Sequence, residues 1–268
     1  MLKVSLIQMD LAHGDPVENR RKLEGLLREA LKPKVKPDVI VLPEMWNTGY
    51  ALERLSEIAD RDGRPTIEWL KKVAAENGIN IVAGSIADIR SESPAEEPRV
   101  YNTAYVINRS GEVVARYDKV HRFRLMGEEK YVAPGERAVT FDLDGVTCGL
   151  AICYDIRFPE FIRKIALLGA RILFVPAQWP KPRQMHWKLL NMVRAIENQF
   201  YVVGVNRVGS QGKAVFPGIS LVVNPWGEVL LEADEKEGIF ETTIDLSAVD
   251  KVRRYIPVFE DRRPDVYY

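Results

Sequence analysis

Short runs of apolar residues alternate along the first third of the chain with segments in which apolar residues recur every three or four positions. The runs at 3–10 and 38–44 are typical of buried strands, and a segment with helical spacing, 18–32, lies between them. The same order recurs with a helix predicted over 66–78 and a strand over 79–86. Helices that link strands in this way are typical of β-α-β units.

A hairpin is predicted in the middle of the chain. A polar, proline-containing loop at 90–98 comes first, and two strands follow at 101–108 and 113–120. The residues RSGE between these strands favour a tight turn, which is the usual link between antiparallel neighbours.

The second half of the chain repeats the organisation of the first. The elements predicted there are a strand over 146–153, a helix over 159–169, a strand over 170–177, a helix over 185–200 and a hairpin over 220–233. These units predict a mixed α/β layered fold with internal pseudo-symmetry, organised as a single domain over residues 1–268. Neither GxGxxG nor GxxxxGKS occurs, so neither nucleotide-binding motif is indicated.

Charge is balanced over the 268 residues, with 38 Lys plus Arg and 38 Asp plus Glu. There is no basic field to attract nucleic acid or an anionic membrane, so we expect a small-molecule partner. The first residues form neither a signal-peptide core nor a span of about 20 apolar residues. We therefore expect a soluble, cytoplasmic protein.

The two cysteines, Cys148 and Cys153, lie on one predicted strand. At about 3.3 Å per residue they are separated by about 16 Å, which is too far for a disulfide. The cysteines are too few for a zinc site and the three histidines are scattered, so we expect neither a metal nor a cofactor. Cys153 directly follows an apolar run and is therefore either a small core residue or a nucleophile.

Three polar residues with complementary chemistry follow three predicted strands: Glu44, Lys119 and Cys153. The carboxyl ends of strands in an open α/β sheet meet at one crevice, where ligands bind. A carboxylate can accept the thiol proton, and an ammonium can stabilise both the thiolate and the oxyanion formed when sulfur adds to a carbonyl. Together these groups could add a thiol to a carbonyl carbon, and Glu44 could later activate the water that hydrolyses the resulting thioester.

Each of these residues also has an ordinary structural explanation. Cys153 could be inert core in a non-enzymatic α/β binding module, Glu44 could cap the next segment, and Lys119 could belong to a solvated basic stretch. A different enzyme class, a Cys-His hydrolase, would use His121 or His186 as the base for Cys153. The residues alone leave these alternatives open.

The segments around the three residues carry a family resemblance. LPEMWNTGY (42–50), YDKVHRF (117–123) and CYDIRFPE (153–160), in this order, resemble the signature segments of the nitrilase superfamily of carbon–nitrogen hydrolases. The resemblance implies a four-layer α-β-β-α sandwich that dimerises through one helical face to give a longer layered assembly. It also implies that the tail, at about 251–268, lies at the subunit interface of a homodimer or a higher homo-oligomer.

The same resemblance implies a catalytic Glu-Lys-Cys set, here Glu44, Lys119 and Cys153. A second glutamate usually follows the lysine in this superfamily and would be Glu128, although the adjacent Glu129 leaves the choice open. The set implies a thioester intermediate and the release of ammonia.

Subfamily features lie at 177–187, 194–209 and 216–228, segments that look most similar to the omega-amidase branch. That branch hydrolyses the terminal amide of 2-oxo dicarboxylic acid monoamides such as 2-oxoglutaramate. The alternatives are an aliphatic nitrilase and an N-carbamoyl amino acid amidohydrolase with the same three residues. Cys153 is not followed by the tandem arginines that the carbamoyl enzymes tend to show.

Substrate-binding residues are expected close to the catalytic candidates. Arg183 could hold the carboxylate of the substrate, and Trp179, close to it in the chain, is a further substrate-binding candidate. The backbone N–H of Tyr154 could bind the oxyanion. The aromatic residues Tyr50 and Trp46 could line the pocket, although large aromatic residues after a strand more often pack in the core.

Overall fold

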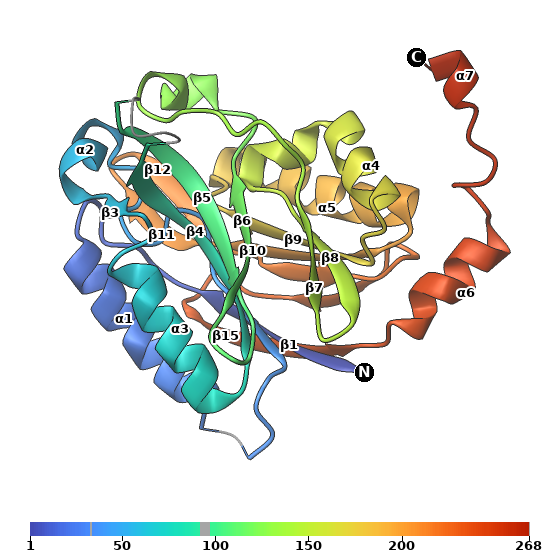
Figure 1. Ribbon diagram of the computed structural model, residues 1–268, viewed down its shortest axis with the longest axis horizontal. Helices are drawn as coiled ribbons and strands as arrows, with labels where there is room; N and C mark the ends of the chain where they lie inside the picture. Colours follow the sequence, from blue (N-terminus) through green and yellow to red (C-terminus); the bar gives the residue numbers. More distant parts are fainter. Residues whose placement is uncertain (33, 92–96, 268) are drawn as a thin grey trace.

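Two β-sheets lie face to face in the computed structural model, with helices on the outer face of each sheet (Figure 1). The structure describes residues 1–32, 34–91 and 97–267. Most of the loop predicted at 90–98 lies outside these ranges, as does the last residue of the tail, Tyr268.

The first sheet has seven strands in the order β15-β1-β2-β4-β5-β6, with β3 paired to β4. Its strands are β1 (Leu2–Gln8), β2 (Val39–Val41), β3 (Asp60–Arg61), β4 (Asn80–Arg90), β5 (Arg99–Ile107), β6 (Val113–Asp118) and β15 (Gly238–Ile244). The second sheet has six strands in the order β14-β13-β10-β9-β8-β7, and a separate two-stranded sheet pairs β11 with β12. These strands are β7 (Thr140–Leu143), β8 (Val146–Leu150), β9 (Ile172–Ala177), β10 (Tyr201–Asn206), β11 (Val208–Gln211), β12 (Ala214–Pro217), β13 (Leu221–Val223) and β14 (Val229–Glu232).

The two sheets share one topology, which confirms the predicted pseudo-symmetry. Each has three parallel central strands, β1-β2-β4 in the first sheet and β8-β9-β10 in the second. Each is extended on one side by an antiparallel pair, β5-β6 or β13-β14, and on the other side by one antiparallel strand, β15 or β7. The parallel strands are linked by helices because the chain must cross back over the sheet to start each of them in the same direction.

Helices cover the outer faces of the sheets, α1 and α3 on the first and α4 and α5 on the second (Figure 1). The helices are α1 (Pro16–Ala30), α2 (Leu55–Ile58), α3 (Thr66–Asn77), α4 (Pro159–Leu167), α5 (Gln184–Asn198), α6 (Ser247–Tyr255) and α7 (Pro264–Tyr267). Single turns of 3₁₀ helix are η1 (Leu52–Arg54), η2 (Arg124–Met126), η3 (Glu128–Lys130), η4 (Cys153–Arg157) and η5 (Lys181–Arg183).

Local sequence accounts for the ends of the outer helices. The Asp15 side chain accepts a hydrogen bond from the Glu18 N–H at the start of α1, and Pro16 is pre-shaped for the first turn. Helix α3 ends at Gly78, which adopts a left-handed φ of 65° that suits glycine.

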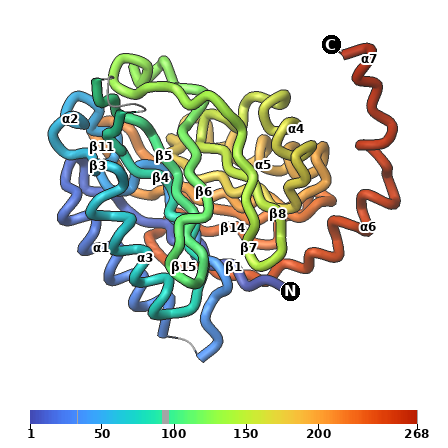
Figure 2. Tube along the Cα trace, in the orientation of Figure 1, coloured from blue at the N-terminus to red at the C-terminus, as the bar shows by residue number. Residues whose placement is uncertain are grey.

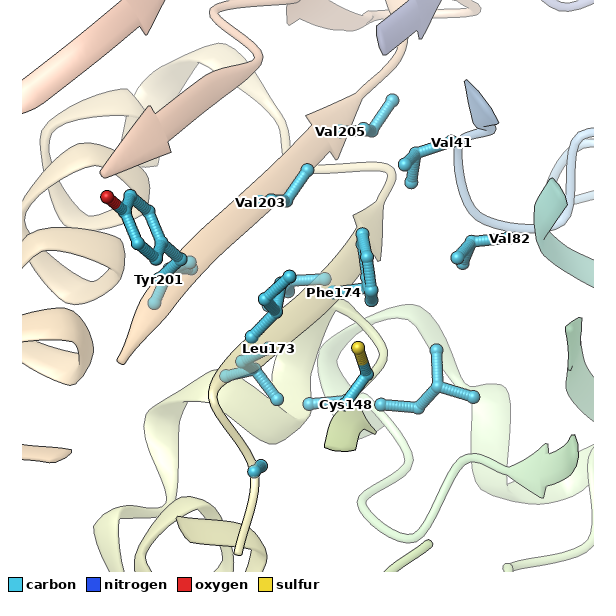
Figure 3. Packing of buried hydrophobic residues seen from close by; sticks show 14 of the residues in the cluster. Val41, Val82, Cys148, Leu173, Phe174, Tyr201, Val203 and Val205 are labelled. Carbon is cyan, nitrogen blue, oxygen red and sulfur yellow. The ribbon is translucent and has the colours of Figure 1, made fainter. Parts of the chain in front are cut away.

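In the first sheet, the alternation of side chains along the strands separates two apolar clusters. In β1, Val4 and Leu6 point into the space between the sheets, whereas Ile7 points toward α1 and α3. Figure 3 shows Val41 and Val82 of the first sheet facing Val203, Val205 and Phe174 of the second. The apolar layer between the sheets therefore holds the two halves of the chain together.

Two predicted strands end earlier than the apolar pattern indicates. The strand predicted at 38–44 ends at Val41, and the strand predicted at 146–153 ends at Leu150. Cys153 has a φ of 47°, and Met45, directly after Glu44, has a φ of 41°, so the chain leaves the extended conformation at both places. Both candidate residues therefore lie in turns beyond their strands.

The C-terminal segment leads away from the two sheets after α6, and α7 stands apart from the other elements (Figure 2). Val249 and Val252 of α6 are buried, whereas α7 has no buried residue within its described length. Among the residues described, no helix is both long and apolar enough to cross a membrane. That residues 1–268 form a single domain stays a prediction.

Candidate active site

Glu44 and Lys119 meet at the carboxyl ends of the strands of the first sheet. Strands β2, β4 and β6 point in one direction, so the turn after β2 and the residue after β6 lie at the same edge. The Lys119 Nζ atom lies 2.8 Å from Glu44 Oε1, and both side chains have no exposed surface. The same ammonium lies 2.9 Å from Glu128 Oε2 and 3.1 Å from the Tyr50 hydroxyl.

A glycine in β4 makes room for the turn that carries Glu44. Gly84 has a φ of 60°, and a Cβ atom there would lie 2.0 Å from the carbonyl oxygen of Pro43. The Ser85 hydroxyl then accepts the Met45 N–H at 2.9 Å. The irregularity in β4 therefore fixes the backbone on both sides of Glu44.

Further donors converge on Glu44 from both halves of the chain. The Tyr50 hydroxyl donates to Oε1 at 2.7 Å, the Asn102 side chain donates to Oε1 at 2.9 Å, and the Gln178 backbone N–H donates to Oε2 at 2.8 Å. Burial by itself raises the pKa of Glu44, but the charge of Lys119 and these hydrogen bonds outweigh burial and hold the pKa below its usual range. Glu44 is therefore ionised at neutral pH.

Glu128, rather than Glu129, is the second glutamate against Lys119. The Glu128 carboxylate is completely buried and accepts the Phe123 N–H at 2.6 Å and the Asn102 side chain at 3.2 Å. Glu129 points elsewhere, and its Oε2 atom has no hydrogen-bond partner among the described residues. The sequence left open whether Glu128 or Glu129 is the second glutamate, and the contact of Glu128 with Lys119 decides it.

The charges around Lys119 sum to minus one, because one ammonium faces the carboxylates of Glu44 and Glu128. Burial lowers the pKa of Lys119, but the two carboxylates together raise it well above its usual value, so the ammonium stays charged. Burial and then the charge of Glu44 raise the pKa of the Cys153 thiol, and Lys119 offsets only part of this rise. Lys119 thus favours the thiolate, as expected from the sequence, but burial and Glu44 outweigh it, so the thiol of the resting site is neutral.

Asp155 holds the turn that carries Cys153. Its buried carboxylate accepts the Ile152 N–H at 2.8 Å, the His121 N–H at 2.9 Å and the Tyr117 hydroxyl at 2.6 Å. Tyr117 and His121 flank Lys119 in the chain, so Asp155 ties the lysine segment to the cysteine turn. Sequence reasoning did not find Asp155, although its place two residues after Cys153 within the motif was a signal.

Neither histidine proposed as an alternative base faces Cys153. His121 Nδ1 lies 2.8 Å from Asp155 Oδ1, and its ring stacks on Phe158 with centroids 3.7 Å apart. His186 Nδ1 lies 3.3 Å from an Arg157 nitrogen. The other cysteine, Cys148, is buried in the core between the sheets, and burial raises its pKa far above the usual range.

A narrow pocket with about 310 Å³ of space not filled by protein atoms opens above Cys153. Of the substrate-binding candidates, Tyr50, Tyr154, Trp179 and Arg183 line it. The remaining lining residues are Phe123, Met126, Cys153, Arg157, Gln178 and Pro180. Trp46 follows the other alternative and packs in the core, where its indole N–H donates to the Ala83 carbonyl at 2.8 Å.

Within the described ranges, no three His, Cys, Asp or Glu side chains are grouped so that they could hold a metal ion. The expectation of a protein without metal or cofactor stays a prediction.

The chain resembles known proteins in sequence and in fold. Residues 3–254 match the family model described as carbon-nitrogen hydrolase. The chain is 47% identical over 264 residues to the 2-oxoglutaramate amidase of Bacillus subtilis, covering 98% of each protein. A solved CN-hydrolase superfamily protein from Xanthomonas campestris, with an arsenic adduct in its active site, superposes with a TM-score of 0.88 at 30% identity, covering 98% of this chain and 97% of the other.

A second solved structure shows a reactive cysteine. It is a Glu-to-Gln mutant of the amidase from Nesterenkonia sp. AN1, in which acrylamide has added to the active-site cysteine. It superposes with a TM-score of 0.83 at 25% identity, covering 100% of this chain and 98% of the other.

Proposed function

The chain belongs to the carbon-nitrogen hydrolase family, and from this premise we propose that it hydrolyses the terminal amide of small acid monoamides such as 2-oxoglutaramate through a thioester on Cys153. It is a hydrolase of carbon–nitrogen bonds other than peptide bonds. The substrate class is supported by full-length similarity to a 2-oxoglutaramate amidase. The observation that carries the mechanism is the buried pair of Glu44 and Lys119 at 2.8 Å, which lies close enough to Cys153 that Glu44 raises and Lys119 lowers the pKa of the thiol.

In the first step the Cys153 sulfur attacks the amide carbon while its proton passes to Glu44. The negative charge moves from the Glu44 carboxylate to the amide oxygen, so the net charge of the buried site does not change. Lys119 and the backbone N–H of Tyr154 are placed to stabilise that oxygen. Within the described residues, the Tyr154 N–H has no other acceptor.

The next steps return the site to its starting state. The carbon–nitrogen bond breaks as Glu44 gives its proton to the leaving nitrogen, and ammonia departs from a thioester on Cys153. A water molecule then attacks the thioester carbon with Glu44 as the base. The carbon–sulfur bond breaks, the proton passes to the thiolate, and the carboxylic acid is released.

A substrate panel tests this proposal. Ammonia release is measured with 2-oxoglutaramate, an N-carbamoyl amino acid and an aliphatic nitrile, for the wild type, Cys153→Ala and the control Cys148→Ala. We expect the highest kcat/KM with 2-oxoglutaramate, full activity in Cys148→Ala and none in Cys153→Ala. A higher kcat/KM with the nitrile or the carbamoyl compound would replace the proposed substrate class, and activity in Cys153→Ala would overturn the thioester.

We also infer a homodimer, because α5 presents an exposed apolar stripe. Met185, Leu189, Val193 and Ile196 recur on one side of this helix and are 71%, 50%, 44% and 50% exposed. A second copy of α5 would cover the stripe, and the exposed residues of the C-terminal tail would extend the contact. The cytoplasmic location stays a prediction.

A further inference from the structure

We propose that Arg207 is a positioning residue for Glu44, because it holds the side-chain oxygens of Gln178 and Gln211 and so directs both amide nitrogens toward the turn that carries Glu44. The inference rests on the proposed function, in which Glu44 is the base, and it names the group that keeps this base in place. Arg207 does not belong to the described lining of the cavity above Cys153, so it acts through other residues.

Arg207 is a buried arginine that donates to several oxygens at once. It joins β10 to β11 and has no exposed surface. Its Nη2 atom donates to Asp10 Oδ1 at 3.1 Å and to the Leu11 carbonyl at 3.2 Å, and its Nε atom donates to the Val208 carbonyl at 3.1 Å. The Phe216 ring covers the guanidinium, whose Cζ atom lies 4.4 Å from the ring centre. These contacts fix the plane and the direction of the guanidinium.

A glycine lets the chain beside Arg207 approach Asp10 closely. Gly209 has a φ of 91°, and a Cβ atom there would collide with the Asp10 carboxylate. The Val208 N–H donates to the Met9 carbonyl at 3.1 Å, so the start of β11 is joined to the segment that follows β1. Burial lowers the pKa of Arg207 to about 10 and Asp10 offsets part of this effect, so the guanidinium is charged at neutral pH.

The guanidinium reaches Glu44 through Gln178. The Arg207 Nη1 atom donates to Gln178 Oε1 at 3.2 Å. Because a guanidinium has no acceptor, the amide oxygen must face it, and the amide nitrogen is left to face the turn. There Gln178 Nε2 donates to the Glu44 carbonyl at 2.8 Å, and the Gln178 backbone N–H donates to Glu44 Oε2 at 2.8 Å. Gln178 therefore holds the backbone and the carboxylate of Glu44 together.

A second glutamine connects Arg207 to the far end of the same turn. The Arg207 Nη1 atom also donates to Gln211 Oε1 at 3.4 Å, and Gln211 Nε2 donates to the Tyr50 carbonyl at 3.3 Å. The Tyr50 hydroxyl in turn donates to Glu44 Oε1 at 2.7 Å. Each oxygen of the Glu44 carboxylate thus accepts a hydrogen bond from a residue that is tied to Arg207, directly for Gln178 and through Gln211 for Tyr50.

Loss of the guanidinium would release both amides. A Gln178 amide that rotates by half a turn presents its oxygen to the Glu44 carbonyl, and two acceptors that face each other cannot form a hydrogen bond. The Glu44 carboxylate then moves from the position at which it takes the Cys153 proton, and a displacement of about 1 Å can lower a rate about 10²-fold. Because Glu44 transfers a proton and does not bind the substrate, the effect should fall on kcat rather than on KM.

The test compares Arg207→Met with a change in the glutamine through which it acts. Ammonia release from 2-oxoglutaramate gives kcat and KM for the wild type, Arg207→Met, Gln178→Met and the double variant. The control is Arg171→Met, since Arg171 directly precedes β9 whereas Gln178 directly follows it, and Arg171 pairs with Asp250 at 2.8 Å. All variants are assayed under conditions in which urea unfolding shows them to be folded.

The expected result is a loss of kcat that does not accumulate. In Arg207→Met, kcat should fall about 10- to 100-fold while KM stays close to the wild-type value. Gln178→Met should also lose kcat, and the double variant should be no slower than the slower single variant, because both changes break one series of contacts. Arg171→Met should lose stability and keep kcat.

Two further variants keep the test decisive if Arg207→Met does not fold. Arg207→Lys keeps a cation for Asp10 but offers one nitrogen in place of the two that reach Asp10 and the glutamines, so its kcat should fall as well. Asp10→Asn keeps an oxygen acceptor for Arg207 and removes only the charge, so it should keep kcat.

The results that would overturn the positioning role differ from those that would overturn the function. A wild-type kcat in folded Arg207→Met or Arg207→Lys, a loss that lies in KM, or losses that add in the double variant would each overturn the role of Arg207 and leave the amidase standing. Failure of the wild type to release ammonia from any amide would overturn the proposed function, and the role of Arg207 with it.

Discussion

Lys119 is bound to Glu44 by an ion pair of 2.8 Å in which neither side chain has any exposed surface. A buried pair of this kind is stable only while its hydrogen bonds and counter-charges are complete, because each ion has lost its hydration. Here the ammonium also pairs with Glu128, so one cation supports two buried carboxylates. Both the activity and the stability of the protein depend on this balance of one ammonium against two carboxylates.

Substitution Lys119→Met should abolish most activity and also destabilise the fold. Loss of an oxyanion donor lowers kcat by about 10² to 10³, and two carboxylates left without their cation cost about 3–5 kcal/mol. The pKa of Glu44 then rises, because burial is no longer offset by Lys119, so the variant binds protons on folding. Its stability is greatest below the unfolded pKa of this carboxyl and falls as pH increases. Urea unfolding should therefore show that Lys119→Met loses more free energy of unfolding, relative to the wild type, at pH 8 than at pH 5.

The matched control for this change is Lys130→Met, which removes an exposed lysine from the same segment. It should keep the stability and kcat of the wild type at both pH values. An equal loss of unfolding free energy at pH 5 and pH 8 in Lys119→Met would contradict the claim that one ammonium balances two buried carboxylates.

Substitution Glu44→Gln should stop turnover and yet make Cys153 easier to alkylate. Removal of the base blocks both proton transfers, so ammonia release is lost. The negative charge of Glu44 raises the thiol pKa, so its removal lowers that pKa and increases the thiolate fraction at neutral pH. The rate of iodoacetamide labelling of Cys153, followed against pH by mass spectrometry, should have its midpoint at lower pH than in the wild type; a midpoint shifted upward would argue against this charge balance.

The wild type should lose stability at both extremes of pH through the same cluster. The pKa of Glu44 is lowered, so its contribution is present above its unfolded pKa and is lost as pH falls through the folded value. The pKa of Lys119 is raised, so its contribution is present below its unfolded pKa and is lost as pH rises through the folded value. Urea unfolding of Glu44→Gln should show a smaller loss of stability between pH 5 and pH 3 than the wild type, and an equal loss would contradict this prediction.

The Cys153→Gly variant should be at least as stable as the Cys153→Ala variant. Cys153 has a φ of 47°, a left-handed conformation that costs a residue with a Cβ atom about 1 kcal/mol relative to glycine. Cys153→Gly removes more packing atoms than Cys153→Ala but relieves this strain. Both variants should be inactive, and thermal or urea unfolding that shows the glycine variant to be clearly less stable would mean that the turn is not strained.

A charge on the α5 stripe should separate the proposed dimer. Leu189→Glu places a carboxylate in the middle of the contact, so the protein should elute as a monomer, which light scattering can measure. Truncation after about Lys251 should weaken association as well. The control is Val17→Glu on α1, where Val17 is 81% exposed; a wild type that is monomeric at micromolar concentration would refute the dimer.

Elements with local signals were predictable from the sequence, and elements shaped by backbone strain were not. The helix predicted over 66–78 is α3, which ends at Asn77 because Gly78 closes it with a left-handed residue. The apolar pattern over 146–153 extended the strand to Cys153, because hydrophobic spacing carries no information on the sign of φ. The same spacing could not show that Trp46 faces the core rather than the pocket.

The sequence by itself determined which reactive groups follow the ends of which strands. Glu44 and Cys153 follow apolar runs, and Lys119 follows the run VVARYD. The strands before Glu44 and Lys119 point in one direction, so these two residues reach one edge of the first sheet. The family motifs around them determined the reaction class. These are properties of order and spacing along the chain, which packing does not alter.

Only the tertiary structure decided the net charge of the catalytic site and the sign of the charge at each end of the pocket. Gln178 donates to Glu44 from 134 positions away, and Arg157 meets His186 from 29 positions away. Such contacts exist because the two sheets pack face to face, and no local pattern encodes them. Electrostatic energy depends on the distances between all the charged groups, so the neutral resting thiol follows from the fold and could not be read from any motif.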